Sequence, residues 1–312
     1  MWYLKNNLST DHFTEEELYS VRVLAQTDQS GAEGLIVAYD CENGLYRQLF
    51  IHKINPHVFL STKLFPDVWL KEAKKKNIPI SESDYESILD SPPALLNQNP
   101  SWKELSKLIK DSDGWDIRYY YLSKQTGHSS NYGIEWHTFI MNVLEKSGGK
   151  VVIGKEDGQR FLLVHRSTFP EIVERCRRIE HQVKKTGIIY NMFGHPYIIT
   201  DNYLSDMKPY YAWGAQSTVG AISLKAASDM QEYIEENNKS WDFLAETHDS
   251  IMHQSPLDEV KDLAKMQQQF INIEFTSPVD GVKFRMRSET KIGFCWADKT
   301  ETNPLGLREV KL

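Results

Sequence analysis

The stretch "LYSVRVLAQTDQSGAEGLIVAYD" (residues 18–40) changes its pattern just after one carboxylate. Residues 18–28 are rich in β-forming types in rough alternation, which predicts a strand that ends at Asp28. The residues that follow place Leu35, Ile36 and Tyr39 on one helical face, which predicts a helix. Asp28 is therefore expected at the end of a strand, with Glu33 in the first turn of the next helix.

A second carboxylate lies in "ETHDSIMHQ" (residues 246–254), where an alternating segment breaks at a His-Asp pair and an apolar run follows. A charged turn between two strands explains this segment taken alone, because Asp is common at hairpin connections. A carboxylate at a hairpin tip is also a rigid ligand for a hard cation such as Mg²⁺. If Asp28 and Asp249 lie on adjacent strands, they could bind two divalent ions about 4 Å apart. Enzymes that catalyse in-line displacement at phosphorus use this arrangement.

The bulk composition is that of a water-soluble globular protein. The 312 residues suffice for one large domain or two intimate ones, and 40% hydrophobic with 25% charged content is ordinary. No apolar run approaches the ~20 residues of a membrane span, and the first 20 residues lack the apolar core of a signal peptide. We therefore expect a cytoplasmic protein without a membrane partner. Cys41, Cys176 and Cys295 form no C-x-x-C pair, which argues against disulfides and structural zinc.

The charge distribution leaves the class of partner open. A net charge of −7 disfavours a nucleic-acid binder on average. Basic runs at 71–77, 175–185 and 283–291 could nevertheless line a cleft, or could be solvated faces of helices and strands.

Most of the remaining chain has helical patterns. The expected helices are 56–65 with Pro56 in the first turn, 116–132, 136–147, 168–187 stopped by Gly187, 218–238, and 255–270 with Ser255 as cap and Pro256 first. Residues 66–113 read as short helices and loops in an inserted subdomain. Strand patterns recur at 188–200, as a hairpin around Gly194, and at 282–296. These elements predict an α+β fold, an antiparallel sheet backed by helices, with a helical lobe from 50 to 180.

The expected 116–132 helix carries a polar face. Lys124, His128 and Tyr132 are spaced by four and share one side, Arg118 lies near the N-terminal end, and Gly133 is a possible stop. This face could grip a triphosphate at one end and a sugar and base at the other. An amphipathic helix with a polar stripe is the alternative reading of the same residues.

Six segments, in order over residues 18–296, together resemble family A DNA polymerases, the DNA polymerase I family, and its phage members in particular. "DQSGAE" resembles the first motif, D-x-S-Q-x-E; "KQTGHSSNYG" the second, K-x-x-x-[FY]-x-x-x-Y-G; and "THDS" the third, V-H-D-E. The others are "INPHVF" for D-I-H, "MFGHPY" for L-F-G-R-x-R, and "AWGAQSTVGAISLKA" for N-x-P-I-Q-G-T-A-A-D-I.

The resemblance implies a polymerase palm at 1–50 and 186–312 and a mostly helical fingers subdomain at 51–185, including the insertion at 66–113. It implies a DNA-directed DNA polymerase that joins dNTPs to a primer on template DNA. Family members place a thumb and usually an exonuclease domain upstream of the first motif, whereas only 17 residues precede the expected first strand here. We therefore expect both domains to be absent and a separate thumb/exonuclease polypeptide to act as partner. If the chain is phage-encoded, we expect it in the host cytoplasm.

The resemblance also implies a set of site residues. Asp28, Asp249 and the Gln29 backbone carbonyl would hold two Mg²⁺ ions, with Mn²⁺ possible. Glu33 would be the steric gate against a ribose 2′ hydroxyl. The dNTP-binding residues would be Lys124, Arg118, His57, His128 and Tyr132, and the DNA-binding residues Gln216, His248 and Gly133.

Four positions depart from the motifs. Gly31 stands for the Gln of the first motif, His128 for the aromatic residue and Tyr120 for the Arg of the second, and Ser250 for the acidic residue of the third. Arg118 could substitute for the missing Arg from a neighbouring position. No departure removes a metal carboxylate, so we expect the chemistry to survive.

Two other function classes remain open. One is a non-catalytic, polymerase-like DNA-binding subunit of a replication complex. The other is an HD-type metal phosphohydrolase built around His248 and Asp249, a fold that would need further His ligands on helices.

Overall fold

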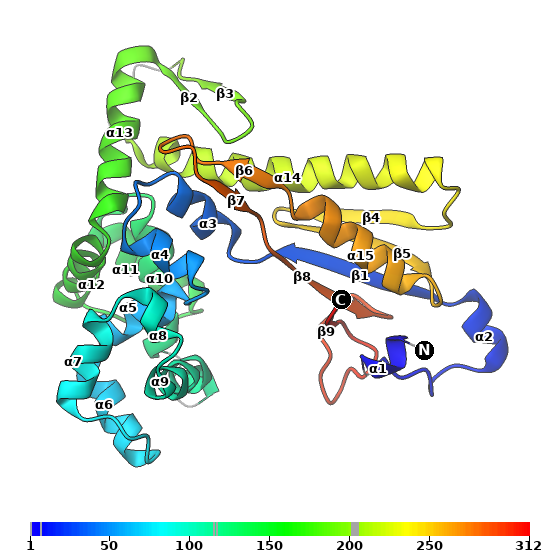
Figure 1. Ribbon diagram of the computed structural model, residues 1–312, viewed down its shortest axis with the longest axis horizontal. Coiled ribbons are helices and arrows are strands. Elements are labelled where there is room, and N and C mark those ends of the chain that lie inside the picture. The colour runs from blue at the N-terminus through cyan, green and yellow to red at the C-terminus, as the bar shows by residue number, and fades with distance from the viewer. Residues whose placement is uncertain (1, 7, 115, 117, 201–205) are drawn as a thin grey trace.

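A five-stranded antiparallel sheet forms the centre of one half of the molecule (Figure 1). The computed structural model describes residues 2–6, 8–114, 116, 118–200 and 206–312. The strand order is β4-β5-β1-β8-β9, and each neighbouring pair is antiparallel. The strands are β1 (Arg22–Gln29), β4 (Asp242–Thr247), β5 (Ser250–Pro256), β8 (Ser288–Gly293) and β9 (Arg308–Val310). The expected antiparallel sheet is confirmed.

The alternation of β1 separates a helix-covered face from a more open face. Val23, Ala25, Thr27 and Gln29 are buried, and the residues between them are partly exposed. The buried side packs against α15 (Val260–Ile271) and α14 (Lys208–Glu236): Thr27 Oγ1 lies 3.0 Å from a Gln267 oxygen, and Gln29 Nε2 donates to the Val219 carbonyl at 3.0 Å. Asp28 is therefore on the opposite face from the covering helices.

Two sequence expectations near the sheet are wrong. Residues 18–20 belong to α2 (Glu15–Ser20), not to the strand, because Thr14 and Glu17 form a reciprocal capping box that starts a helix there. Ser255 and Pro256 end β5 rather than starting a helix, since they pair with β1 residues at the end of the ladder. The helix expected at 218–238 also begins earlier, because α14 starts at Lys208 with a Pro in its first turn.

The other half of the molecule is helical, which confirms the expected helical lobe and the α+β class (Figure 1). Its helices are α4 (Leu45–Ile51), α5 (Pro56–Leu64), α6 (Pro66–Lys75), α7 (Glu82–Asp90), α8 (Pro93–Leu96), α9 (Pro100–Lys110), the 3-10 turn η1 (Asp111–Gly114), α10 (Arg118–Ser130), α11 (Trp136–Lys146), α12 (Lys155–Thr168) and α13 (Pro170–Thr186). The fully buried Trp69 donates from Nε1 to the Ser61 carbonyl at 3.0 Å, which ties the 66–113 segment to α5. The expected 116–132 helix includes Ile117, which is not among the described residues. The sequence patterns did not predict α12.

Smaller elements join these parts. Gly187, with φ +65°, ends α13 as expected. The expected hairpin follows, formed by β2 (Ile188–Tyr190) and β3 (Pro196–Ile198) with Gly194 at φ +77° in its turn. The remaining elements are α1 (Trp2–Lys5), α3 (Ala32–Tyr39), β6 (Glu274–Thr276) and β7 (Lys283–Arg285).

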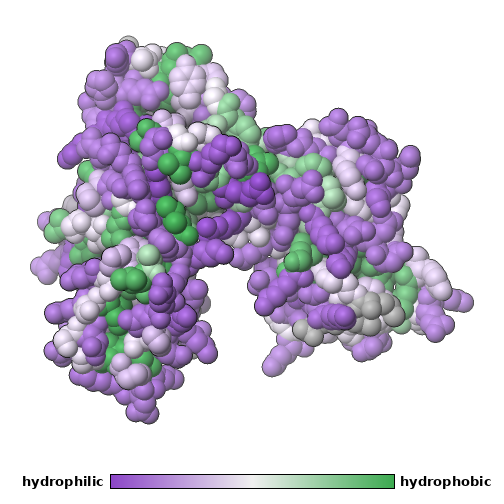
Figure 2. Space-filling model, in the orientation of Figure 1, coloured by the Kyte–Doolittle hydropathy of each residue, from purple (hydrophilic) through white to green (hydrophobic). Residues whose placement is uncertain are grey.

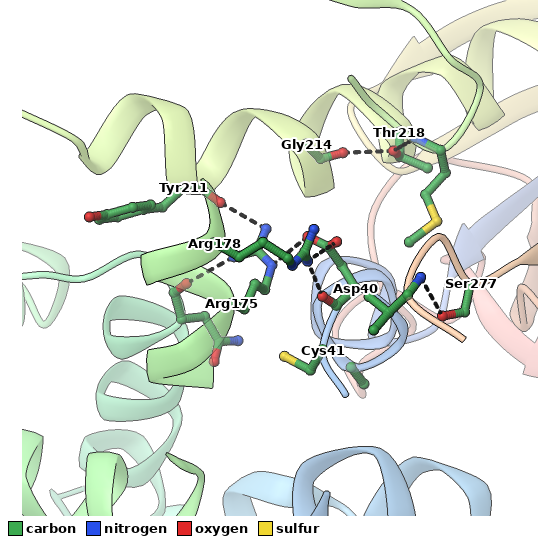
Figure 3. Close-up of polar contacts among 12 residues, drawn as sticks. Asp40, Cys41, Arg175, Arg178, Tyr211, Gly214, Thr218 and Ser277 are labelled. Atoms are coloured by element: carbon green, nitrogen blue, oxygen red, sulfur yellow. Dashed lines mark hydrogen bonds and ion pairs between the residues drawn. The ribbon is translucent and has the colours of Figure 1, made fainter. Parts of the chain in front are cut away.

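An ion-pair cluster around the buried Arg175 joins the helical half to the sheet half (Figure 3). Asp40, just after α3, accepts from Arg175 Nε and Arg178 Nη2 of α13, each at 2.6 Å. Arg175 also donates to the Tyr211 carbonyl of α14 at 3.0 Å. Arg175 of α13 therefore contacts both Asp40, which follows α3, and Tyr211 of α14.

The face of the molecule shown in Figure 2 is predominantly polar and has a wide concavity between the helical half and the sheet half. None of the helices in the described ranges is both long enough and apolar enough to cross a bilayer.

Candidate active site

The β-sheet brings the two predicted metal carboxylates together. Asp28 faces Ser250 in the antiparallel register of β1 and β5, and Asp249 directly precedes Ser250. The Gln29 amide donates to the Asp249 carbonyl at 2.9 Å. Two acidic residues separated by more than two hundred positions are thus neighbours at one end of adjacent strands.

The environment of Asp28 opposes its negative charge. Burial raises the pKa of the Asp28 carboxyl, and the nearby Asp249 carboxylate raises it further. Hydrogen bonds from Ser250 and Gln26 and the charge of Lys291 act in the opposite direction, but the net shift is upward. A half-buried pair of like charges of this kind is stabilised by a bound cation.

The turn that carries Asp249 is tight. His248 has φ +53°, a left-handed conformation that is uncommon for residues other than glycine, and the Asp249 amide donates to the Thr247 carbonyl at 2.6 Å. The two residues therefore form the connection between β4 and β5, as the sequence predicted. The hairpin fixes the main chain of Asp249 relative to Asp28.

The donor set suits Mg²⁺ in type. Mg²⁺ in proteins is commonly bound through one or two carboxylates and keeps several waters. Asp28 and Asp249 supply two such carboxylates. No cluster of three or more His, Cys, Asp or Glu side chains placed to hold a metal occurs within the ranges that the structure describes. The Asp28–Asp249 pair could hold such an ion through its two carboxylates.

Glu33 links the hairpin tip to the helical half. It lies in the first turn of α3, and its Oε2 accepts a hydrogen bond from the Tyr132 hydroxyl. Its Oε1 lies 3.3 Å from His248 Nε2. Burial and the Glu33 charge raise the pKa of Tyr132, so the phenol remains a donor to this carboxylate at neutral pH.

The polar face expected on α10 lines a pocket of about 640 Å³. Lys124, His128 and Tyr132 lie along it together with Glu33 and Gln216, an exposed residue of α14. Five residues that the sequence assigned to nucleotide or DNA binding thus share one pocket.

His57 packs beside this face as a neutral ring. Its imidazole centroid lies 4.9 Å from that of His128, and burial, together with the charges of His128 and Lys124, lowers the pKa of His57 to about 3. Burial and Lys124 also lower the pKa of His128. Both rings can form hydrogen bonds at neutral pH, but Lys124 supplies the positive charge of this group.

Arg118 and Gly133 have clear local roles. Arg118 forms a two-pronged contact with Asp116, through Nε at 2.9 Å and Nη2 at 2.6 Å, and does not line the pocket with Lys124. Tyr120, at the position of the second-motif Arg, instead accepts a hydrogen bond from Asn55 Nδ2 at 3.2 Å. Gly133 has φ +68°, and a Cβ there would lie 2.9 Å from the Tyr211 ring.

The sequence patterns missed the part of the pocket that α11 lines. Thr138, Asn142 and Lys146 of α11 line it, and their spacing of four was the signal that could have found them. Lys208 at the start of α14 also contributes. The pocket therefore contains three lysines, not the single cation that the motif identified.

No protein-family model and no curated protein sequence matches this chain. Among solved structures it is similar to the "POL domain of Pol1 from M. smegmatis complex with DNA primer-template and dNTP", with a TM-score of 0.56 and 12% sequence identity. The similarity covers 88% of this chain and 40% of that chain, so this chain spans less than half of that protein's length. The chain therefore has a DNA polymerase-like fold.

Proposed function

We propose that this chain is the palm and fingers portion of a family A DNA-directed DNA polymerase, which transfers a nucleotide from a dNTP to a primer 3′ hydroxyl. The observation that carries the proposal is that Asp28 near the end of β1 and Asp249 in the adjoining β4–β5 turn are neighbours in a polymerase-like fold. The lysine-containing pocket beside Glu33 supports it, because phosphate groups require compensating positive charge. The palm at 1–50 and 186–312, the fingers at 51–185 and the thumb-bearing partner chain remain predictions.

The residues present fit a two-metal reaction. When bound at Asp28 and Asp249, with the Gln29 carbonyl as a further ligand, two Mg²⁺ or Mn²⁺ ions would activate the 3′ hydroxyl and stabilise the leaving pyrophosphate. The two carboxylates would supply the negative charge that binds these ions. One lies near the end of β1 and the other at the tip of the β4–β5 hairpin.

The surrounding residues would position the substrates. Lys124 would bind the triphosphate, with His57 and His128 as neutral hydrogen-bonding groups beside it. Glu33 would exclude a ribose 2′ hydroxyl, since Tyr132 and His248 hold its carboxylate on two sides. Gln216 is exposed in the same pocket and could reach the primer-template minor groove, and His248 the primer terminus.

A primer-extension assay with Mg²⁺ and dNTPs tests the proposal. Asp28→Ala and Asp249→Ala should each lower the rate by about 10³-fold or more, because metal ions supply several kcal/mol of transition-state stabilisation. Asp242→Ala is the matched control, since this carboxylate lies on β4 but pairs with Arg22 at 2.6 Å. Unchanged extension by both site variants would refute the assignment.

A further inference from the structure

A polar pair that the motifs do not contain lies beside Asp28. Gln26 precedes Asp28 by two residues on β1, so both side chains lie on the same face of the sheet. Gln26 Nε2 donates to Asp28 Oδ1 at 3.1 Å and to Ser250 Oγ at 3.1 Å. An amide nitrogen carries two hydrogens, so it can make both bonds at once.

Ser250 completes this network from the neighbouring strand. It is buried, lies opposite Asp28 in the register, and its Oγ is 2.6 Å from Thr247 Oγ1. Thr247 and Ser250 also pair with each other at the end of the β4–β5 ladder. The network therefore spans three strands and is anchored by the main-chain pairing of β1 with β5 and of β5 with β4.

We propose that Gln26 and Ser250 are positioning residues that orient the Asp28 carboxylate for a divalent cation. The inference rests on the proposed function and deepens it. An Asp side chain without partners would sample several rotamers, and each must be given up when the ion binds. Outer partners that orient a ligating carboxylate typically change metal affinity by about 10- to 100-fold. Ser250 stands where the third motif has an acidic residue, so this chain orients one carboxylate with a hydroxyl there instead.

Titration of the full chain with Mn²⁺, followed by electron paramagnetic resonance without DNA or nucleotide, tests this role. Gln26→Met keeps the length of the side chain but removes the donor, and should weaken Mn²⁺ binding about 10-fold. Ser250→Ala should also weaken it, by at least about threefold, and Ser250→Thr, which retains the hydroxyl, should restore it. The matched control is Gln254→Met on β5, whose Nε2 donates to Asp242 at 3.0 Å, and it should leave affinity unchanged.

The outcomes separate the two proposals. If Asp28→Asn abolishes Mn²⁺ binding but Gln26→Met and Ser250→Ala bind like the parent chain or more tightly, the positioning role is overturned and the proposed function stands. If the parent chain binds no Mn²⁺, or Asp28→Asn binds as well as the parent, the metal site itself is wrong and both proposals fail. Thermal unfolding of each variant confirms that a changed affinity reflects the site and not loss of the fold.

Discussion

Removal of the Asp40 carboxylate should destabilise the junction between the two halves of the molecule. In Asp40→Ala, Arg175 loses its ionic partner while its side chain stays 0% exposed. Arg178 also loses its contact, but that side chain is 42% exposed and can be solvated. The cost therefore arises mainly from one uncompensated buried charge (Figure 3).

The size of the effect follows from these contacts. Breaking a buried ion pair by removing one partner costs about 3–5 kcal/mol, whereas an exposed pair contributes about 0–1 kcal/mol. Arg175 keeps the carbonyls of Tyr211 at 3.0 Å and Asn131 at 3.5 Å as acceptors, which favours the lower end. We expect Asp40→Ala to lower the free energy of unfolding by about 3 kcal/mol.

Urea denaturation followed by circular dichroism measures this loss. Asp229→Ala is the control, because its pair with Lys225 at 2.7 Å is solvent-exposed and should contribute less than about 0.5 kcal/mol. In an Arg175→Met background, which lacks the buried guanidinium at this position, Asp40→Ala should cost much less. A loss below about 1 kcal/mol in the parent background would show that the Arg175 charge is compensated in another way.

Two further predictions concern titration and substrate choice. Burial lowers the pKa of His165 to about 3, and its buried Nε2 has no hydrogen-bond partner. The ring therefore stays neutral in the folded chain as the pH falls below 6.5, the ordinary pKa of His. In the unfolded chain the same ring takes up a proton at that pH. This group should therefore lower the free energy of unfolding by about 2 kcal/mol between pH 7.5 and pH 5. Urea denaturation of His165→Phe should show a correspondingly smaller loss over the same pH range. An equal loss in both chains would contradict the lowered pKa of His165. For substrate choice, Glu33→Ala should raise incorporation of rNTPs relative to dNTPs by about 10- to 100-fold in single-nucleotide extension, because the carboxylate held by Tyr132 and His248 is removed. An unchanged ratio would show that Glu33 does not exclude the 2′ hydroxyl.

The sequence predicted those features that depend on neighbouring residues in the chain. Alternation identified most of β1, Pro56 marked the start of α5, and glycines marked the end of α13 and the turn of the β2–β3 hairpin. The spacing of Lys124, His128 and Tyr132 placed them on one side of the expected 116–132 helix. In the structure α10 ends at Ser130, so Tyr132 follows the helix, but all three residues line one pocket. These signals are strong because helix and strand periodicity, caps and left-handed turns act over only a few residues.

The same local reasoning failed where a local signal competed with another or a distant segment decided the outcome. At 15–20 the capping box of Thr14 and Glu17 outweighed the β-forming composition, and at Ser255 and Pro256 pairing with β1 outweighed a plausible helix start. The role of Arg118 in dNTP binding stays a prediction, and its guanidinium contacts Asp116 two residues away.

The sequence by itself determined which residue types stand at the strand end, the hairpin tip and the helix face. Only the tertiary structure decided that Asp28 lies beside Asp249, that Gln26 bridges Asp28 and Ser250, and that Asp40 meets Arg175. The physical reason is that strand register and burial depend on segments far apart in the chain. Local periodicity shows which side of an element a residue occupies, but the partner it meets there depends on how the remote elements pack.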